Sequence, residues 1–249
     1  FQKIKEANEL THQSDIWETI ARELGHEIKN PLTGIRGTTQ LLKEELATSK
    51  FDDFIDTILE EVDRLSALSN RMLGGDLNAV ELESVNIHEL LDHVNNLVVA
   101  ENMIDQKNSL GSDGSSPRKV NIIKAYQPPI ILKGDKSQLT QIFLNLLRNA
   151  VQALEGEGEI LIDTRVGYKT AIGGEVFNKV AEVRVIDNGK GVDPKLRNSI
   201  FLPLVSGRQD GTGLGLSIAQ KLARANRGII TLERNIRKTE FLVRIPIGG

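Results

Sequence analysis

The sequence predicts an α+β protein in two parts, a helical hairpin followed by a mixed sheet that carries its helices on one face. Three observations lead to this prediction. Residues 1–75 repeat apolar side chains at helical spacing, the chain from residue 84 onward mixes helical with strand-like segments, and 39% of the 249 residues are hydrophobic. Such a hydrophobic content can fill a core and argues against wholesale disorder.

The composition excludes several classes of protein. Lys and Arg number 31 against 34 Asp and Glu, so the net charge is −3 and the basic surplus of a nucleic-acid-binding protein is missing. The absence of cysteine excludes disulfide scaffolds, cysteine nucleophiles and thiolate metal sites. Apolar runs fall far short of the ~20 residues of a membrane helix. Because the sequence begins at Phe1 without a signal-peptide pattern, we expect a soluble, cytoplasmic fragment that a sensory or membrane part could precede.

The first 75 residues predict two amphipathic helices, separated by a break at residues 47–50 and ended by Gly74-Gly75. The two apolar stripes consist of Ile16, Ile20, Leu24, Ile28, Ile35 and Leu42, and of Phe54, Ile55, Ile58, Val62, Leu65, Leu68 and Met72. A lone hairpin covers such stripes poorly, so we expect two copies to pair into a dimeric four-helix bundle. A monomeric hairpin packed on the C-terminal half of its own chain is the alternative.

The C-terminal part, residues 84–249, follows a linker at residues 76–83. Its neighbouring elements are hairpin-like, which predicts the mixed sheet. We expect a helix from 85 to about 103, a polar loop at 104–118, a strand near 119–125, a helix near 135–154, strands near 158–166 and 177–187, a Gly-rich stretch at 188–215, a helix near 214–226, and strands near 228–233 and 240–246.

His26 is the first candidate for chemistry. On a helix it points away from the apolar stripe, with Asn30 one turn along on the same side, and Pro31 should bend the helix beside it. The neighbouring carboxylate, Glu27, could take a proton from one ring nitrogen while the other attacks. An ordinary surface histidine is the alternative. Zinc binding through His-Glu-x-x-His is excluded because the fifth position is Asn30.

A polar stripe on the 135–154 helix is the second candidate. It consists of Gln141, Asn145, Arg148, Asn149 and Gln152. Amide oxygens can complete a Mg²⁺ shell that is mostly water and phosphate, and Arg148 could meet phosphate. A solvated helix face is the alternative.

Two glycine-rich segments follow. Asp187 ends a strand before Gly189 and Gly191, so its carboxylate could accept a hydrogen bond from an exocyclic amine, although Asp-Asn-Gly is also a plain turn signal. Residues 211–215 (Gly-Thr-Gly-Leu-Gly) open a helix and could offer backbone N–H groups to phosphate. This segment matches neither the dinucleotide-binding fingerprint nor a P-loop.

In their order, these motifs resemble the H, N, G1, F and G2 boxes of two-component sensor histidine kinases. The matching motifs are His26-Glu27-x-x-Asn30-Pro31-Leu32, Asn145-x-x-x-Asn149-Ala150, Asp187-x-Gly189-x-Gly191, Phe201-x-Pro203 and Gly211-x-Gly213-x-Gly215. The longer stretches His-Glu-Ile-Lys-Asn-Pro-Leu-Thr-Gly-Ile-Arg-Gly and Leu-Val-Ser-Gly-Arg-Gln-Asp-Gly-Thr-Gly-Leu-Gly-Leu-Ser are most similar to nitrogen-regulation (NtrB-type) kinases.

The resemblance implies a fold and an activity. Residues 1–75 would be a dimerisation and histidine-phosphotransfer bundle, and residues 84–249 a GHKL-type (Bergerat) ATP-binding α/β sandwich. The homodimer would use ATP and Mg²⁺ to phosphorylate His26 and pass the phosphoryl group to an aspartate of a response regulator, with phosphatase activity besides. The regulator would be of NtrC type, and a PII-type signal protein is a further expected partner.

The resemblance also implies roles for residues. Glu27 would be the general base for His26, and Asn30 would orient water for dephosphorylation of the partner. Asn149 would hold Mg²⁺, and Asp187 would take the adenine amine. Residues 189–215 would form a lid over the nucleotide. The nucleotide-binding positions would be Asn145, Arg148, Asn149, Asp187, Gly189, Gly191, Arg208, Gly211, Thr212, Gly213, Leu214, Gly215 and Thr239, with Arg208 reaching the γ-phosphate.

The chain departs from the family's pattern at two places. Asn226-Arg227-Gly228 stands where members often have His-Gly-Gly, and Lys238 replaces the glycine before Thr239. Two other functions are weighed against the kinase: a catalytically weak, ATP-binding dimeric scaffold that docks a regulator, and a plain ATPase. His12, His88 and His93 match no motif, so we expect them to be structural or surface residues.

Overall fold

The computed structural model describes residues 28, 32–40, 55, 58, 59, 62, 82–109, 119–154, 156–207, 212–233 and 238–248. The chain divides into two compact units, Phe1–Asn78 and Ala79–Gly249. No helix in the described part of the chain is long and apolar enough to cross a membrane.

The described residues of the first unit are helical, as the apolar spacing predicts. The apolar stripes separate into buried and exposed positions. Buried side chains, between 3% and 6% exposed, are Leu32, Ile55 and Val62. Side chains between 39% and 48% exposed are Ile28, Ile35 and Ile58. The described part of this unit therefore leaves some apolar side chains uncovered within one chain.

The second unit begins with a short strand that the sequence did not reveal. β1 (Glu83–Asn86) pairs antiparallel with β3 (Ile131–Gly134), and α3 (Ile87–Ser109) follows it directly. The predicted helix thus starts two residues too early, because Asn86 caps α3: its Oδ1 accepts the N–H of His88 (3.1 Å) and its Nδ2 donates to Glu89 (2.8 Å). α3 also extends through residues 104–109, which the prediction assigned to a loop.

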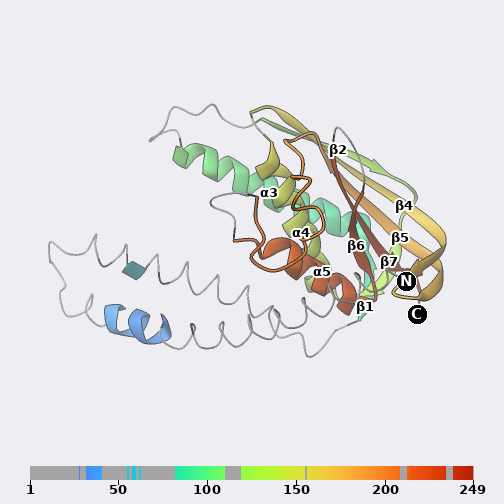
Figure 1. Cartoon of the computed structure of the whole chain (residues 1–249), viewed down its shortest axis with the longest axis horizontal. Coiled ribbons are helices and arrows are strands. Elements are labelled where there is room, and N and C mark those ends of the chain that lie inside the picture. The colour runs from blue at the N-terminus through green and yellow to red at the C-terminus, as the bar shows by residue number, and fades with distance from the viewer. Residues whose placement is uncertain are drawn as a thin grey trace. The chain divides into compact units, whose positions relative to one another are not determined.

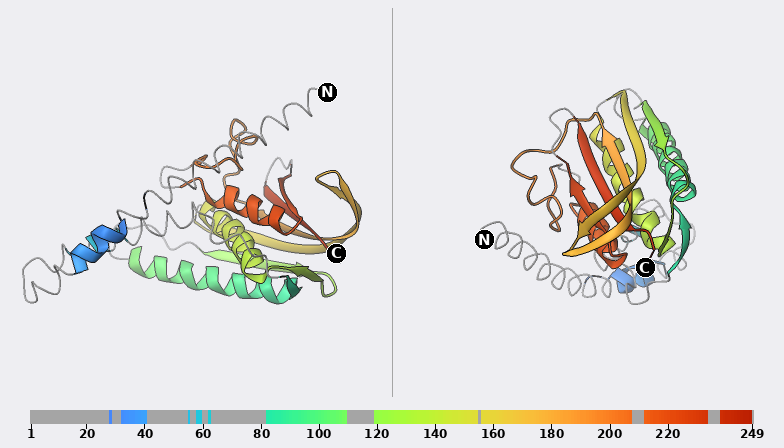
Figure 2. Two further views of the ribbon diagram at one scale, coloured as in Figure 1. Left: turned by 90° about the horizontal axis from the view of Figure 1, so that it is seen from below. Right: turned by 90° about the vertical axis from the view of Figure 1, so that its right-hand side faces the viewer.

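The main sheet is mixed, which confirms the predicted fold class. Its strand order is β2-β4-β5-β7-β6, with β2 parallel to β4 and every other pair antiparallel (Figure 1). The strands are β2 (Val120–Tyr126), β4 (Gly158–Ile172), β5 (Glu175–Asp187), β6 (Ile229–Leu232) and β7 (Thr239–Pro246). α3, α4 (Lys136–Ala153) and α5 (Gly215–Ala225) lie together on one face of it (Figures 1 and 2).

The β4–β5 hairpin is longer than predicted. The prediction ended the first strand before Gly167, but this glycine lies inside β4, where Val180 and Glu182 occupy the space that a side chain would fill. Gly173 and Gly174 form the turn with φ values of 59° and 92°, the left-handed pair that a tight hairpin requires.

The core lies between α4 and the sheet. Asp135 caps α4 by accepting the N–H of Gln138 (3.0 Å), which fixes where the helix begins. Fully buried side chains on α4 are Leu139, Ile142, Phe143, Leu146 and Leu147, and those facing them on the sheet include Ile160, Ile162, Val183 and Val185. Burial of one such side chain stabilises the fold by about 1.5–3 kcal/mol.

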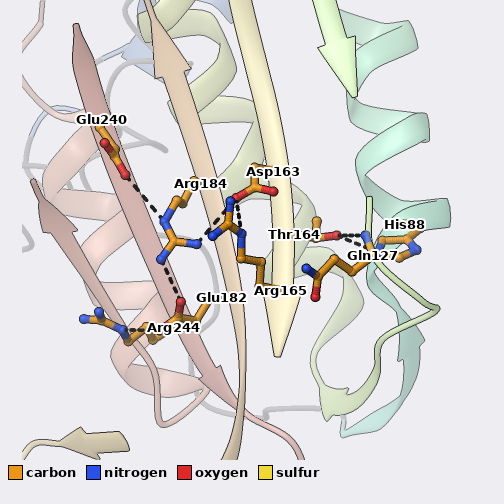
Figure 3. Close-up of polar contacts among 9 residues, drawn as sticks. All are labelled: His88, Gln127, Asp163, Thr164, Arg165, Glu182, Arg184, Glu240 and Arg244. Carbon is orange, nitrogen blue, oxygen red and sulfur yellow. Dashed lines mark hydrogen bonds and ion pairs between the residues drawn. The ribbon is translucent and has the colours of Figure 1, made fainter. Parts of the chain in front are cut away.

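The opposite face of the sheet carries an ion-pair network centred on Arg184 (Figure 3). Its guanidinium meets three carboxylates, those of Asp163 (3.5 Å), Glu182 (2.8 Å) and Glu240 (3.4 Å). Arg244 pairs with Glu182 and Arg165 with Asp163, so three cations balance three anions. Burial would raise the pKa of Glu182, but the hydrogen bonds and charges of Arg244 and Arg184 outweigh it and lower that pKa.

His88 has a structural position, as expected. Its Nε2 lies 2.9 Å from the Thr164 hydroxyl (Figure 3). Its ring stacks on Tyr126 with 4.6 Å between centroids. The Thr164 oxygen also accepts the N–H of Gln127 (3.2 Å). Burial lowers the pKa of His88, partly opposed by the charge of Asp92. His93 is exposed, and His12 lies outside the described residues.

Candidate nucleotide-binding site

Asp187 is the last residue of β5 and is only 2% exposed. Its Oδ1 accepts the N–H of Gly189 (3.0 Å), which closes a turn directly after the strand. Asp187 can therefore both close this turn and accept a hydrogen bond from an exocyclic amine, since a carboxylate offers about four acceptor positions. The strand end holds this carboxylate inside the fold, at the edge where the Gly-rich segment begins.

Thr239 begins β7 and stands directly opposite Asp187 in the β5–β7 ladder. It is 6% exposed, and its hydroxyl is buried without a hydrogen-bond partner among the residues that the structure describes. A buried polar group left unsatisfied costs about 1–3 kcal/mol, so such a hydroxyl is suited to a ligand or a bound water. Asp187 and Thr239 thus place an acceptor and a hydroxyl side by side.

Gly189 and Gly191 shape the turn after Asp187. A Cβ on Gly189 would lie 2.5 Å from the carbonyl oxygen of Ala153, at the end of α4, and the N–H of Lys190 donates to the same oxygen (3.3 Å). Gly189 is therefore required by the packing of α4 against this turn. Gly191 has φ +78°, which favours glycine.

Asn145 and Asn149 lie further back along α4, beside the start of α5. Asn145 is 9% exposed; its Oδ1 accepts from Gln141 (3.2 Å), while its buried Nδ2 has no partner within the described part of the chain. A Cβ on Gly215 would lie 3.8 Å from the Asn145 Oδ1 and 3.9 Å from the Asn149 Nδ2. Both amides therefore flank the first residue of α5.

The N-terminus of α5 is suited to an anion. Its N-cap is Leu214, which makes no side-chain cap, and its first turn holds no acidic residue. The first N–H groups of the helix, the helix dipole and the unpartnered Asn145 amide therefore favour a negatively charged group at the same place.

Gly213 brings the segment before α5 against the segment after Phe201. It has φ +66°, and a Cβ there would lie 2.5 Å from the carbonyl carbon of Leu204. Only glycine fits this close approach. Thr212 is exposed, whereas Leu214 is 3% exposed and belongs to the core.

Arg148 makes a bidentate pair with Glu101 of α3, with its Nε 2.9 Å from Oε2 and its terminal nitrogen 2.5 Å from Oε1. No local pattern indicates this partner, because Glu101 lies on another helix. A phosphate contact by Arg148, which would compete with this pair, stays a prediction.

Within the described residues, no group of three or more His, Cys, Asp or Glu side chains could hold a metal ion. A cation at this site would rely on an amide oxygen, as of Asn149, with the remaining ligands from phosphate and water. That donor set fits Mg²⁺, which keeps several waters and favours oxygen.

The other predicted site residues, His26, Glu27, Asn30, Arg208 and Gly211, lie outside the residues that the structure describes. Of the described ones, the fold gathers Asp187, Gly189 and Thr239 at one end of α4, and Asn145, Asn149 and Gly215 one to two turns earlier. Asn226, one of the departures from the family pattern, carries no sequence signal for the bonds it makes to Asp135 and Gln138.

Two protein families match the chain. The family described as "His Kinase A (phospho-acceptor) domain" matches residues 17–74, and "Histidine kinase-, DNA gyrase B-, and HSP90-like ATPase" matches residues 134–249. Both matches agree with the two parts of the predicted architecture.

Among curated relatives, the "Sensory histidine kinase/phosphatase NtrB" of Escherichia coli O157:H7 is 39% identical over 230 residues, covering 92% of this chain and 62% of the relative. The protein of the same name from Vibrio alginolyticus is 37% identical over 239 residues, covering 94% of this chain and 64% of the relative. The chain thus spans about three fifths of the length of these relatives.

Solved structures of histidine kinases share the fold. Full-length ShkA, crystallised in complex with AMPPNP, matches with a TM-score of 0.66 and 28% identity, over 93% of this chain and 46% of that one. The Acinetobacter baumannii histidine kinase AdeS matches with a TM-score of 0.59 over 90% of this chain and 98% of that one, at 18% identity.

Proposed function

Because the chain belongs to the NtrB-type sensor histidine kinases, we propose that it is an ATP-dependent protein-histidine kinase that phosphorylates His26 and passes the phosphoryl group to an aspartate of a response regulator. Hydrolytic removal of the phosphoryl group from that regulator belongs to the same proposal. The input is nitrogen status, and an NtrC-type regulator and a PII-type protein are the partners.

One observation carries the nucleotide-binding part of the proposal. Two buried polar groups, the Thr239 hydroxyl and the Asn145 Nδ2, have no partner among the described residues, and one lies beside a buried carboxylate, the other beside an uncapped helix N-terminus. An adenine amine next to Asp187 and phosphates next to Gly215 would use both groups. ATP has this combination of a neutral base and an anionic tail.

The described residues at the two ends of this site then have separate roles in holding ATP. Asp187 accepts a hydrogen bond from the adenine amine, and Thr239 contributes its hydroxyl beside it. The N–H groups at the start of α5 and the Asn145 amide hold phosphate oxygens. Asn149 would hold Mg²⁺, which would supply neutralisation of phosphate charge when bound. Alignment and charge neutralisation are the main sources of catalysis in phosphoryl transfer.

The transfer step is assigned to residues of the first unit. One ring nitrogen of His26 forms a bond to the γ-phosphorus, the bond from that phosphorus to the bridging oxygen of ADP breaks, and Glu27 takes the proton from the other ring nitrogen. The phosphoryl group then moves to the aspartate of the regulator, and His26 regains its proton. Asn30 orients water for the later hydrolysis of the aspartyl phosphate.

The same proposal makes residues 1–75 a dimerisation and phosphotransfer hairpin, 76–83 a linker and 84–249 the catalytic domain. The exposed Ile28, Ile35 and Ile58 support a homodimer, because a second hairpin would cover apolar side chains that one chain leaves open.

Phosphotransfer to receiver domains tests the proposed function. The full chain is labelled with γ-³²P-ATP, freed of nucleotide and mixed with a panel of receiver domains, each beside a variant whose acceptor aspartate is changed to Asn. We expect label to move to an NtrC-type receiver and not to its variant. Steady phosphate release without a labelled protein would indicate an ATPase, and ATP binding without either would indicate a scaffold.

A further inference from the structure

α4 and α5 run in opposite directions and approach each other at two places. At the first, Gly215 begins α5 beside the amides of Asn145 and Asn149 on α4. At the second, Asn226, the C-cap of α5, bonds to the first turn of α4. The proposed phosphate site lies between the two helices at the first of these places only.

Asn226 uses both ends of its amide in the second connection. Its Oδ1 accepts the backbone N–H of Asp135 (2.9 Å), and its Nδ2 donates to the Gln138 Oε1 (2.9 Å) and to the carbonyl of Leu222 (2.9 Å). The side chain is 5% exposed, so water does not compete for these bonds. An amide alone among side chains of this size supplies one acceptor and two donors in this arrangement.

The bonding partners of Asn226 are themselves fixed. Asp135 caps α4 through the N–H of Gln138, and a Cβ on the preceding Gly134 would lie 3.0 Å from the Asn226 Oδ1. Because the Leu222 carbonyl belongs to α5, one side chain joins the last turn of α5 to the first turn of α4. Sliding of one helix along the other would break buried hydrogen bonds that nothing replaces.

We propose that Asn226 is a positioning residue for the nucleotide phosphates: it fixes the register of α5 along α4, and so places the N-terminus of α5 against Asn145 and Asn149. This inference rests on the proposed function and concerns the phosphate end of the site alone. Asp187 and Thr239, at the adenine end, are held by the β5–β7 ladder and do not depend on Asn226.

Because the phosphate and adenine ends of the site are held separately, a change at Asn226 should affect ligands with and without phosphates differently. Loss of the Asn226 amide should weaken binding of ATP, which uses both ends of the site, by about tenfold, because small misplacements of binding groups carry costs of this order or more. Binding of adenosine, which lacks phosphates, should remain unchanged. A merely structural residue would affect both ligands together through the folded fraction.

The experiment compares Kd values for Mg²⁺-ATP and adenosine in the full chain by ligand-observed NMR, well below the unfolding temperature. Asn226→Leu removes all three side-chain bonds and keeps the same branched heavy-atom skeleton. Asn226→Asp keeps the acceptor for Asp135 and loses both bonds that the Nδ2 donates, but a rotated Gln138 amide can donate to the new oxygen, so this variant should recover part of the ATP affinity. Thr164→Val is the matched control, because it also removes buried hydrogen bonds but lies on β4.

The proposal expects the ratio of ATP to adenosine affinity to fall about tenfold in Asn226→Leu, less in Asn226→Asp, and not at all in Thr164→Val. An unchanged ratio in both Asn226 variants, or an equal fall in Thr164→Val, would overturn it. If Asn226→Leu does not fold, a lower ratio of ATP to adenosine affinity in Asn226→Asp supports the proposal, and an unchanged ratio there overturns it. Failure of the nucleotide-binding part of the proposed function differs from all of these outcomes, since the unaltered chain would then bind neither ligand; failure of the transfer part leaves these affinities unaffected and is read from the labelling of His26.

Discussion

Thr239 faces Asp187 directly across the β5–β7 ladder, and its hydroxyl is buried with no partner among the residues that the structure describes. Asp187 has the N–H of Gly189 on one oxygen. A buried hydroxyl without a hydrogen bond lowers the stability of the fold, and a ligand that bonds to it recovers this free energy on binding. In this pair, Asp187 is hydrogen-bonded within the fold, whereas the Thr239 hydroxyl is suited to bind a ligand.

Thr239→Val should lower the affinity for ATP about fivefold while leaving the free energy of unfolding equal or higher, because the lost hydroxyl makes no hydrogen bond to any residue that the structure describes. Calorimetric titration with ATP and denaturant unfolding measure the two quantities. Thr239→Ser, which keeps the hydroxyl, is the control. Equal affinity in Thr239→Val would show that the hydroxyl does not contact the nucleotide.

Asp187→Asn should weaken binding of both ATP and adenosine about 10- to 100-fold, because it removes a charged acceptor from the adenine end. An Asn oxygen can still accept from Gly189, so the turn and the fold should survive. NMR titration of both ligands and a thermal melt test this. Unchanged affinity in a folded variant would exclude Asp187 from the adenine role.

Gly213 and Gly215 should respond differently to alanine. Gly213→Ala places a Cβ 2.5 Å from Leu204 on a left-handed backbone, so both thermal stability and ATP affinity should fall. Gly215→Ala meets nothing closer than 3.8 Å in the free protein, so stability should hold while the Cβ crowds the phosphates and lowers affinity. Thermal melts with and without ATP distinguish them. Full ATP affinity in Gly215→Ala would show that the phosphates do not bind at the start of α5.

The ion pairs around Glu182 should make stability pH-dependent in acid. Because its folded pKa is below the usual 4.5, the carboxylate contributes stability above that pH and loses it as pH falls through the folded pKa. At pH 7, Glu182→Gln should cost about 2 kcal/mol. The difference in the free energy of unfolding between Glu182→Gln and the unaltered protein should shrink as the pH falls from 5 toward the lower folded pKa of Glu182.

Hydrogen exchange of β5 amides over this pH range measures the effect. Glu157→Gln is the control, because the Glu157–Lys119 pair is 78% and 80% exposed and should contribute little. A Glu182→Gln difference that stayed constant with pH would contradict the assigned charge state.

Long periodic elements were predictable from the sequence, and short pairings were not. α4 and α5 match their predicted ranges within about two residues because their apolar spacing and the Asp135 cap are local signals. β1 and β3 have four residues each, and each depends on the other across more than forty residues of chain, so no local pattern marks them. The tip of the β4–β5 hairpin was missed because Gly167 interrupts the strand pattern while packing well inside it.

The site shows the same division. Motif spacing identified Asp187 and Asn145 as candidates, but the facing of Thr239 and Asp187 comes from strand register, which the sequence does not display. Asn226 departs from the family pattern without a local sign of its role, whereas the structure shows a bonded side chain that joins two helices. Partners that are distant in the chain, such as Glu101 for Arg148, appear only in the folded structure.

Incubation of the full chain with γ-³²P-ATP, beside His26→Ala, tests the central claim most directly. We expect label on the unaltered protein that is stable in base and lost in acid, as for phosphohistidine, and no label on the variant, whose ATP affinity should match that of the unaltered chain. Equal labelling of His26→Ala, or label that survives acid, would contradict it.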